Sequence, residues 1–154
     1  MNFPDVFYTA GALGAGLNAG IFFAFSTFIM RALASLTTAE GVRAMQAINK
    51  TVITPLFMLV FMGTAVIALA EIIRFAVLPD SRNAMALAAA LLYLLGTFGT
   101  TIRFNVPRNN RLEACEPESS ETKAVWKDYL VTWTYWNHAR TLAATLSTMG
   151  WTLA

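Results

Sequence analysis

The feature that most constrains this chain is a set of long apolar segments without charge. The first runs from about Val6 to Met30 with no Asp, Glu, Lys or Arg, and it ends at Arg31. A helix of about 20 apolar residues is long enough to cross a hydrocarbon core of about 30 Å. The run is also longer than the core of a signal peptide, so we expect it to be retained as the first membrane span.

Three further apolar segments predict the rest of the fold. The second begins at Pro55, a favourable first-turn residue, and the polar stretch from Ser35 to Thr54 predicts a short interfacial amphipathic helix before it. The predicted fold class is all-α, a transmembrane four-helix bundle with this short helix between spans one and two. Residues 1–154 form a single membrane domain, with spans at approximately 6–30, 55–77, 84–104 and 131–153.

The composition agrees with a membrane protein and argues against other classes. Hydrophobic residues make up 56% of the 154 residues and charged residues only 13%, whereas soluble domains carry about 25% charged residues. A net charge of +2 without a basic run gives no basis for nucleic acid as a partner. One cysteine, Cys115, and one histidine, His138, cannot assemble a Cys/His cluster, so we expect no metal site.

The connections between the spans differ in length and charge. Pro79, Asp80 and Ser81 predict a tight turn that makes spans two and three antiparallel neighbours, whereas 105–123 is predicted to be a hydrophilic loop. Lys and Arg concentrate in the loops after spans one and three, which predicts a protein of the cytoplasmic membrane with both termini outside. Glu71 and Arg74 lie one turn apart and predict an interfacial ion pair.

Small residues recur at four-residue steps in the first span. Ala12, Gly16, Gly20 and Ala24 have the small-xxx-small spacing that lets the backbone of a second helix approach closely. We therefore expect this stripe to be a helix-packing face, and we expect a large side chain at Gly16 or Gly20 to disrupt assembly.

Polar residues gather at one end of the predicted bundle, because the ends of spans one and three share a membrane face with the beginnings of spans two and four. The segment from Ala139 onward is shorter than a span, so the embedded part of the last helix must begin near Tyr135 or earlier. The residues drawn into the bilayer or to its edge are Trp136, Asn137, His138 and Arg140.

Arg140 is the most informative of these residues. An arginine inside a membrane helix costs roughly 2.5 to 3.5 kcal/mol on insertion scales, so we expect it to face the bundle interior rather than lipid. Two alternatives stay open, since Arg140 can snorkel to the headgroups and the nearby tryptophans can form an ordinary aromatic belt. The Asn and Thr side chains can equally be interhelical hydrogen-bond partners, and a lone histidine such as His138 can be structural.

Four motifs follow one another along most of the chain: AGLNAGIFFAFSTFIM, MQAINKTVITPLF, FNVPRNNRL and WTYWNHARTLAA. Together they resemble the anthrone-oxygenase-like family of small four-span membrane proteins, in which Asn-x-Pro-x-Asn is followed by Trp-x-x-x-Asn-x-x-Arg-Thr. One departure is Arg108, where similar chains commonly have leucine, and we expect it to alter the rim of the pocket. The residues that match the pattern are Asn105, Pro107 and Asn109, then Trp133, Asn137, Arg140 and Thr141.

The resemblance implies oxidation of an anthrone to an anthraquinone. Our hypothesis is a cofactor-independent membrane oxygenase for an anthrone-like or other flat acidic aromatic substrate, because its enolate reacts with O₂ without metal or flavin. The hypothesis makes His138 the general base, Arg140 the group that stabilises the oxyanion, and Asn137 a third catalytic residue that orients the substrate. The predicted substrate-binding residues are Trp133, Trp136, Asn105, Asn109, Thr141, Asn49 and Ser26.

Two other functions fit the same residues. A non-catalytic membrane protein would bind a lipid, quinone or aromatic metabolite in the same polar cavity, and a purely structural subunit would need no ligand. The expected partners are the lipid bilayer and an apolar aromatic small molecule. The sequence leaves open a homo-oligomer and a haem on the single histidine.

Overall fold

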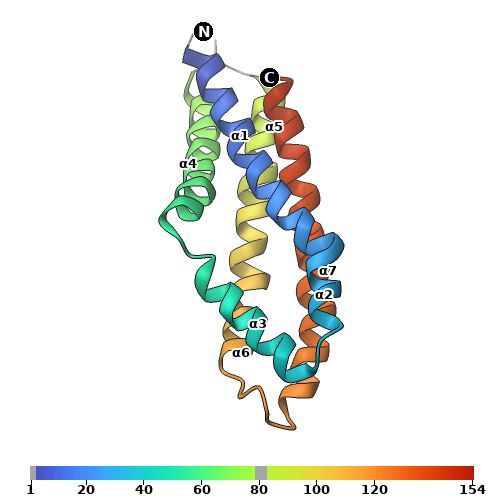
Figure 1. Ribbon diagram of the computed structural model, residues 1–154. Helices are drawn as coiled ribbons and strands as arrows, with labels where there is room; N and C mark the ends of the chain where they lie inside the picture. Colours follow the sequence, from blue (N-terminus) through green and yellow to red (C-terminus); the bar gives the residue numbers. More distant parts are fainter. Residues whose placement is uncertain (1–2, 79–82) are drawn as a thin grey trace.

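The computed structural model describes residues 3–78 and 83–154, which are helical apart from short connections (Figure 1). This agrees with the predicted all-α class, while the predicted turn at Pro79, Asp80 and Ser81 lies outside the described residues. The helices are α1 (Phe3–Ala24), the π-helical η1 (Phe25–Ile29), α2 (Met30–Ala34), α3 (Thr38–Thr51), α4 (Pro55–Val77), α5 (Ala84–Leu91), the π-helical η3 (Leu92–Gly99) and η4 (Thr101–Asn105), α6 (Val106–Glu113) and α7 (Thr122–Thr152).

Three helical segments are long and apolar enough to cross a membrane: Asp5–Ala34, Pro55–Val77 and Ala84–Glu113. They make this chain an integral membrane protein, as predicted. The helix α7 covers the predicted fourth span and has 31 residues, but within the described chain it is not one of these candidate spans. Polar and charged residues within α7, among them Asn137, His138 and Arg140, lower its hydropathy.

The third candidate span continues further than the sequence indicates. A loop was predicted from 105 onward, but the helix runs through η4 and α6 to Glu113, so this prediction is wrong. Pro107 lies in the first turn of α6, where its missing backbone N–H costs little hydrogen bonding. For this reason it does not end the helix. The hydrophilic connection is therefore confined to the short stretch between α6 and α7.

The long helices pack around two hydrophobic clusters. Near the chain termini, which Figure 1 shows at the same end of the molecule, Trp151 and Tyr93 are surrounded by alanines of α1, α4 and α5. Toward the opposite end, Trp126, Tyr129 and Trp133 of α7 pack against buried residues of α2, α3 and α6. Aromatic side chains of η3 and α7 thus fill both halves of the interior, and the small residues let the helices approach.

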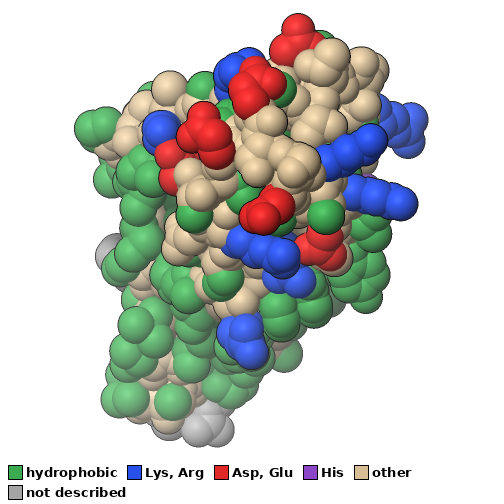
Figure 2. All heavy atoms as spheres, turned by 90° about the horizontal axis from the view of Figure 1, so that it is seen from below, with side chains coloured by type: hydrophobic (Ala, Val, Ile, Leu, Met, Phe, Trp, Pro, Cys, Tyr) green, Lys and Arg blue, Asp and Glu red, His purple; other side chains and the backbone are tan. Residues whose placement is uncertain are grey.

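Charged side chains gather on the end of the molecule that carries α3 and α6, as Figure 2 shows, while the flanks are apolar. Ion pairs tie this end together: Arg43 contacts Glu118, Lys50 Nζ lies 2.6 Å from Glu113 Oε1, and Arg111 Nη1 lies 3.6 Å from Asp128 Oδ2. At the other end the predicted pair of Glu71 and Arg74 is present, with 2.9 Å between Oε2 and Nε.

The small residues of α1 do not all pack as predicted. The buried face of α1 includes Gly11, Ala15 and Asn18, one position round the helix from the predicted stripe. Gly20 is exposed, and a Cβ built there would meet no atom within 4 Å, so its predicted role in packing within this chain is wrong. Close approach within α1 occurs at Gly14, where a Cβ would overlap Thr64 Oγ1. Another close approach is at Gly150 in α7, where a Cβ would lie 2.8 Å from Ala89 Cβ.

Gly150→Ala is therefore expected to destabilise the fold by about 1–3 kcal/mol through overpacking against α5. Gly20→Ala is expected to be neutral or to stabilise by up to about 1 kcal/mol, because alanine favours a helix over glycine. Thermal unfolding of the two variants in detergent micelles measures the difference. Equal destabilisation by both substitutions would contradict the packing described for α1 and α7.

The amphipathic helix α3, which was predicted between the first two spans, begins with a capping box. Glu40 accepts hydrogen bonds from the Thr37 backbone N–H at 3.1 Å and from the Thr37 hydroxyl at 2.6 Å, and the Glu40 N–H donates to the Thr37 hydroxyl. The hydrogen bond from the Thr37 hydroxyl, followed by that from its backbone N–H, holds the pKa of Glu40 below its usual value.

A carboxyl whose pKa is lowered by folding stabilises the fold above its ordinary pKa, and this stabilisation is lost as the pH falls. We expect hydrogen exchange at the first-turn amides of α3 to accelerate as the pH is lowered from about 5 to 3, after correction for intrinsic exchange. The control variant Glu40→Gln should lack this pH dependence. An unchanged profile in the variant would show that another group is responsible.

Candidate functional site

A cavity of about 380 Å³ lies where α3 and the α3–α4 connection meet α1, α4, η4 and α7. Its wall is mainly apolar, with Phe22, Phe57, Phe61 and Phe98 among the lining side chains. Part of this wall is shared with the outer surface, since Ile53 is 67% exposed. The polar residues that line the cavity are Asn49, Thr101, Asn109, Trp133 and Arg140.

Arg140 faces the interior, as expected from its position in α7, and is only 7% exposed. Its Nε donates to Asn137 Oδ1 at 3.0 Å and its Nη1 donates to Thr101 Oγ1 at 3.3 Å. The guanidinium carbon lies 4.0 Å from the ring centroid of Phe22 and 5.0 Å from that of Trp133. No Asp or Glu in the described ranges forms an ion pair with it, so neutral oxygens and aromatic faces hold this cation.

Asn137 fixes the position of Arg140 and joins α7 to the end of the first span. Its Nδ2 donates to the Phe22 carbonyl oxygen at 2.8 Å and to Ser26 Oγ at 2.7 Å, while its Oδ1 accepts from Arg140. Ser26 also lies 3.0 Å from the Thr141 hydroxyl, which donates to the Asn137 carbonyl oxygen. The result is a buried polar network whose only formal charge is that of Arg140.

Asn109 organises the other side of the cavity. Its Oδ1 accepts hydrogen bonds from the Tyr129 hydroxyl at 2.8 Å and from Trp133 Nε1 at 2.7 Å. Tyr129 and Trp133 stack with their ring centroids 5.7 Å apart. The Trp133 indole is therefore held at its nitrogen by Asn109 and faces the Arg140 guanidinium with its ring.

Two π-helical segments carry residues of this network. Ser26 lies in η1, and Thr101 and Asn105 lie in η4. A π turn holds an extra residue, shifts the side chains after it round the helix axis, and is frequent at functional sites. Regular 3.6-residue spacing cannot reveal such a shift, so the sequence gives no signal for it.

The structure brings most of the predicted site residues together. Asn105 is fully buried behind the cavity, where its Nδ2 donates to the Trp133 carbonyl oxygen at 3.2 Å. Four of them line the cavity: Arg140, Trp133, Asn109 and Asn49. Asn137 and Asn105 form hydrogen bonds with lining residues, and within the described chain Ser26 and Thr141 are joined to the cavity wall only through Asn137.

Three other residues lie away from the cavity. The side chain of His138 is exposed, and that of Trp136 stacks on Phe104 with the ring centroids 3.6 Å apart. Arg108, expected at the pocket rim, instead donates from Nε to the Thr132 hydroxyl at 2.9 Å. None of the three is among the residues that line the cavity.

Some residues of the site were missed by the sequence analysis. Phe22 contacts the guanidinium and Tyr129 holds Asn109, yet neither was assigned to the site. Spacing carries a partial signal, because Tyr129 lies four residues before Trp133 and therefore on the same side of α7. Phe22 is indistinguishable in sequence from the other phenylalanines of the first span.

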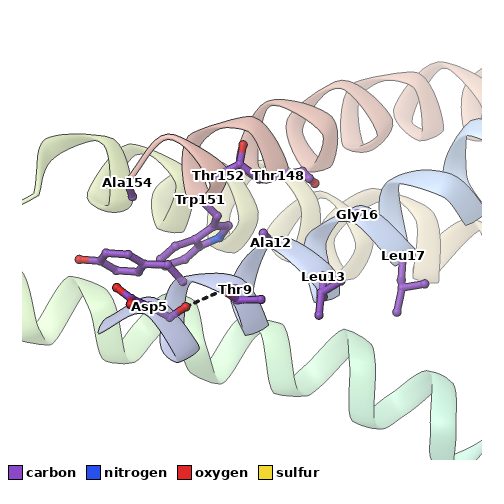
Figure 3. Close-up of a pocket in the computed structure, with 11 residues that line it drawn as sticks. Asp5, Thr9, Ala12, Leu13, Gly16, Leu17, Thr148, Trp151, Thr152 and Ala154 are labelled. Atoms are coloured by element: carbon purple, nitrogen blue, oxygen red, sulfur yellow. Dashed lines mark hydrogen bonds between the residues drawn. The ribbon is translucent and has the colours of Figure 1, made fainter. Parts of the chain in front are cut away.

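A second, larger hollow of about 810 Å³ lies between the beginning of α1 and the end of α7 (Figure 3). Several of its polar side chains already bond within their own helices: Thr9 donates to the Asp5 carbonyl oxygen at 2.6 Å and Thr148 to that of Ala144 at 2.9 Å. The cavity beside Arg140 is the better candidate for a functional site, because it joins a buried charge to an aromatic wall.

The fold and the cavity define an integral membrane protein with a mainly apolar site beside a buried cation. The sequence model of the anthrone oxygenase family matches residues 52–150, so this chain belongs to that family. Searches of curated proteins and of solved structures found no match. Within the site, Asn109, Trp133 and Arg140 lie in the matched range, whereas Phe22 and Asn49 precede it.

Asn137→Ala is expected to destabilise the protein by about 1–3 kcal/mol, because Arg140 Nε loses its acceptor in a buried environment. The adjacent variant His138→Ala removes an exposed side chain and should change the stability by less than about 0.5 kcal/mol. Unfolding of the two variants in the same detergent provides the comparison. If His138→Ala were the more damaging change, the orientation of α7 described here would be wrong.

Proposed function

We propose that this chain is a cofactor-independent membrane oxygenase that acts on an anthrone-like or other flat acidic aromatic substrate. The supporting observation is the Arg140 guanidinium, which is buried at the wall of an apolar cavity and has no carboxylate partner within the described chain. An unpaired buried charge is costly, and negative charge that develops on a bound substrate offsets this cost. Membership of the anthrone oxygenase family favours the same reaction.

In the proposed reaction, the activated methylene of the substrate first loses a proton to give an enolate whose oxygen lies at Arg140. The enolate carbon then reacts with O₂. One oxygen atom becomes the new carbonyl oxygen, and the other leaves as water with the two methylene hydrogens. The methylene carbon is thereby oxidised and O₂ is reduced, with the guanidinium favouring the first step by stabilising the oxyanion.

The proton acceptor in this proposal is water rather than His138. The imidazole is exposed on the outer side of α7, and the described residues that line the cavity include no carboxylate and no imidazole. Arg140 makes proton loss easier by stabilising the product of that step, so a strong base is not required. Phe22, Phe61 and Trp133 provide apolar and aromatic surface for a flat substrate.

The second candidate is a membrane protein that binds a lipid, quinone or aromatic metabolite without converting it. The same lack of an acid or base in the described lining favours this function, since binding needs only the apolar wall and the hydrogen-bonding groups. A turnover measurement separates the two candidates.

The membrane topology is also part of the proposal: α7 crosses the bilayer as a fourth span and completes a four-helix bundle, with both termini outside the cytoplasmic membrane. The helix α7 packs against α1 and α5. Its interior side carries Asn137 and Arg140, and its outer side exposes Leu142, Leu146 and Met149, as lipid contact requires.

The test of function is O₂ consumption by protein reconstituted in nanodiscs and supplied with an anthrone. The wild type should exceed the rate of empty nanodiscs, and Arg140→Gln should lower the protein-dependent rate about 10²-fold, as expected for loss of an oxyanion partner. His138→Ala should retain the wild-type rate within about twofold, because this side chain is outside the cavity. Binding of the anthrone with no rate above the empty nanodiscs would favour the non-catalytic protein.

A further inference from the structure

In the cavity wall, most hydrogen-bond acceptors are occupied by protein donors, whereas some donors have no acceptor within the described chain. The acceptor oxygens are largely occupied by protein donors: Asn109 Oδ1 accepts from both Tyr129 and Trp133, and Thr101 Oγ1 accepts from Arg140. The Thr101 hydroxyl also donates a hydrogen bond to the Thr97 carbonyl oxygen at 2.8 Å. An amide oxygen has two lone pairs, so Asn109 Oδ1 has none left for a ligand.

Donors stay available on Arg140, which faces the Trp133 ring, and on Asn109, which accepts a hydrogen bond from the Trp133 nitrogen. Arg140 uses Nε and Nη1, which leaves Nη2 without a hydrogen-bond partner in the described ranges. The Asn109 NH₂ group likewise has no acceptor in the part of the chain that the structure describes, because its hydrogen bonds involve Oδ1 alone. Asn49 Nδ2 is buried and has no hydrogen-bond partner in the described chain, but the same side chain also carries an acceptor oxygen, so Asn49 does not determine the charge of a ligand.

From this arrangement we infer that the cavity selects its ligand as an anion, with a deprotonated oxygen at Arg140 and a second acceptor oxygen of the same molecule at the Asn109 NH₂ group. The inference rests on the proposed function for its choice of a flat aromatic ligand. It adds that the protein shifts a bound phenol or enol toward ionisation before any reaction occurs. It also makes Asn109 a specificity-determining residue.

The physical reason is the local environment of the charge. A guanidinium among aromatic rings and neutral oxygens is poorly solvated, so an approaching anion gains more than it would in water. A neutral hydroxyl or an amine gains less, because the free groups at Arg140 and Asn109 are N–H donors that need an acceptor. The same molecule is therefore bound more tightly after it has lost its proton.

Alizarin, which is 1,2-dihydroxyanthraquinone, tests this without turnover. It is already a quinone, it carries neighbouring oxygens on one edge, and its colour changes from yellow to red when it ionises near neutral pH. Absorbance titration of alizarin bound to the reconstituted protein should give an ionisation midpoint at least about one pH unit below that in empty nanodiscs, which is a tenfold preference for the anion. Quenching of tryptophan fluorescence verifies binding at each pH.

Three variants locate the effect. Arg140→Gln should remove most of the shift. Asn109→Asp keeps an oxygen that accepts from Tyr129 and Trp133 but replaces the NH₂ donor with a negative charge, so it should move the midpoint upward. Arg103→Gln, which removes an exposed cation from η4, is the matched control and should retain the wild-type shift.

A bound probe that ionises at the same or a higher pH than in empty nanodiscs would overturn the inference, as would a shift that Arg103→Gln removes as fully as Arg140→Gln does. Circular dichroism and elution as a single species show which variants are folded. Should Arg140→Gln fail to fold, Asn109→Asp and Arg140→Lys provide the test. Asn109→Asp should move the midpoint upward, and Arg140→Lys, which keeps the positive charge, should retain the wild-type shift. Oxygenase activity without any shift would refute this inference alone, whereas a shift without activity would refute only the reaction.

Discussion

The burial of one guanidinium without a carboxylate is the constraint on which this structure depends. Arg140 is stabilised by Asn137, Thr101 and the faces of two aromatic rings. These contacts link the first span, the third span and α7 at one level of the molecule. Because removing any of these oxygens leaves a buried donor unsatisfied, the network couples the packing of the helices to the geometry of the site.

The remaining architecture places an alanine-rich half on one side of this polar level and a charged end on the other. Alanines and glycines bring α1, α4, α5 and α7 together near the termini, where Trp151 and Tyr93 fill the space between them. At the other end α3 closes over the cavity and is tied by ion pairs to α6 and the connection after it. The site therefore lies at the boundary between an alanine-rich half and a half that presents charge to water.

Much of the fold could be predicted from the sequence, because long uncharged apolar runs determine where helices lie. The inward orientation of Arg140 followed from the cost of exposing it to lipid. The site was predicted less completely. His138 and Asn137 are adjacent in sequence but point to different sides of α7, and only the three-dimensional packing shows which side faces the cavity. The π-helical turns depend on packing that a one-dimensional pattern does not contain, and the continuation of the helix through Pro107 depends on the position of this residue in the first turn of α6.

For the proposed aromatic ligand, the wall that the cavity shares with the outer surface at Ile53 offers a route of entry from the surroundings of the protein. A flat apolar molecule partitions into the bilayer and becomes concentrated there relative to water. The surroundings then act as a reservoir, and even weak intrinsic affinity gives high occupancy. Selection among the dissolved hydrophobic compounds is left to the few polar atoms inside, so a handful of hydrogen bonds can discriminate where bulk hydrophobicity cannot.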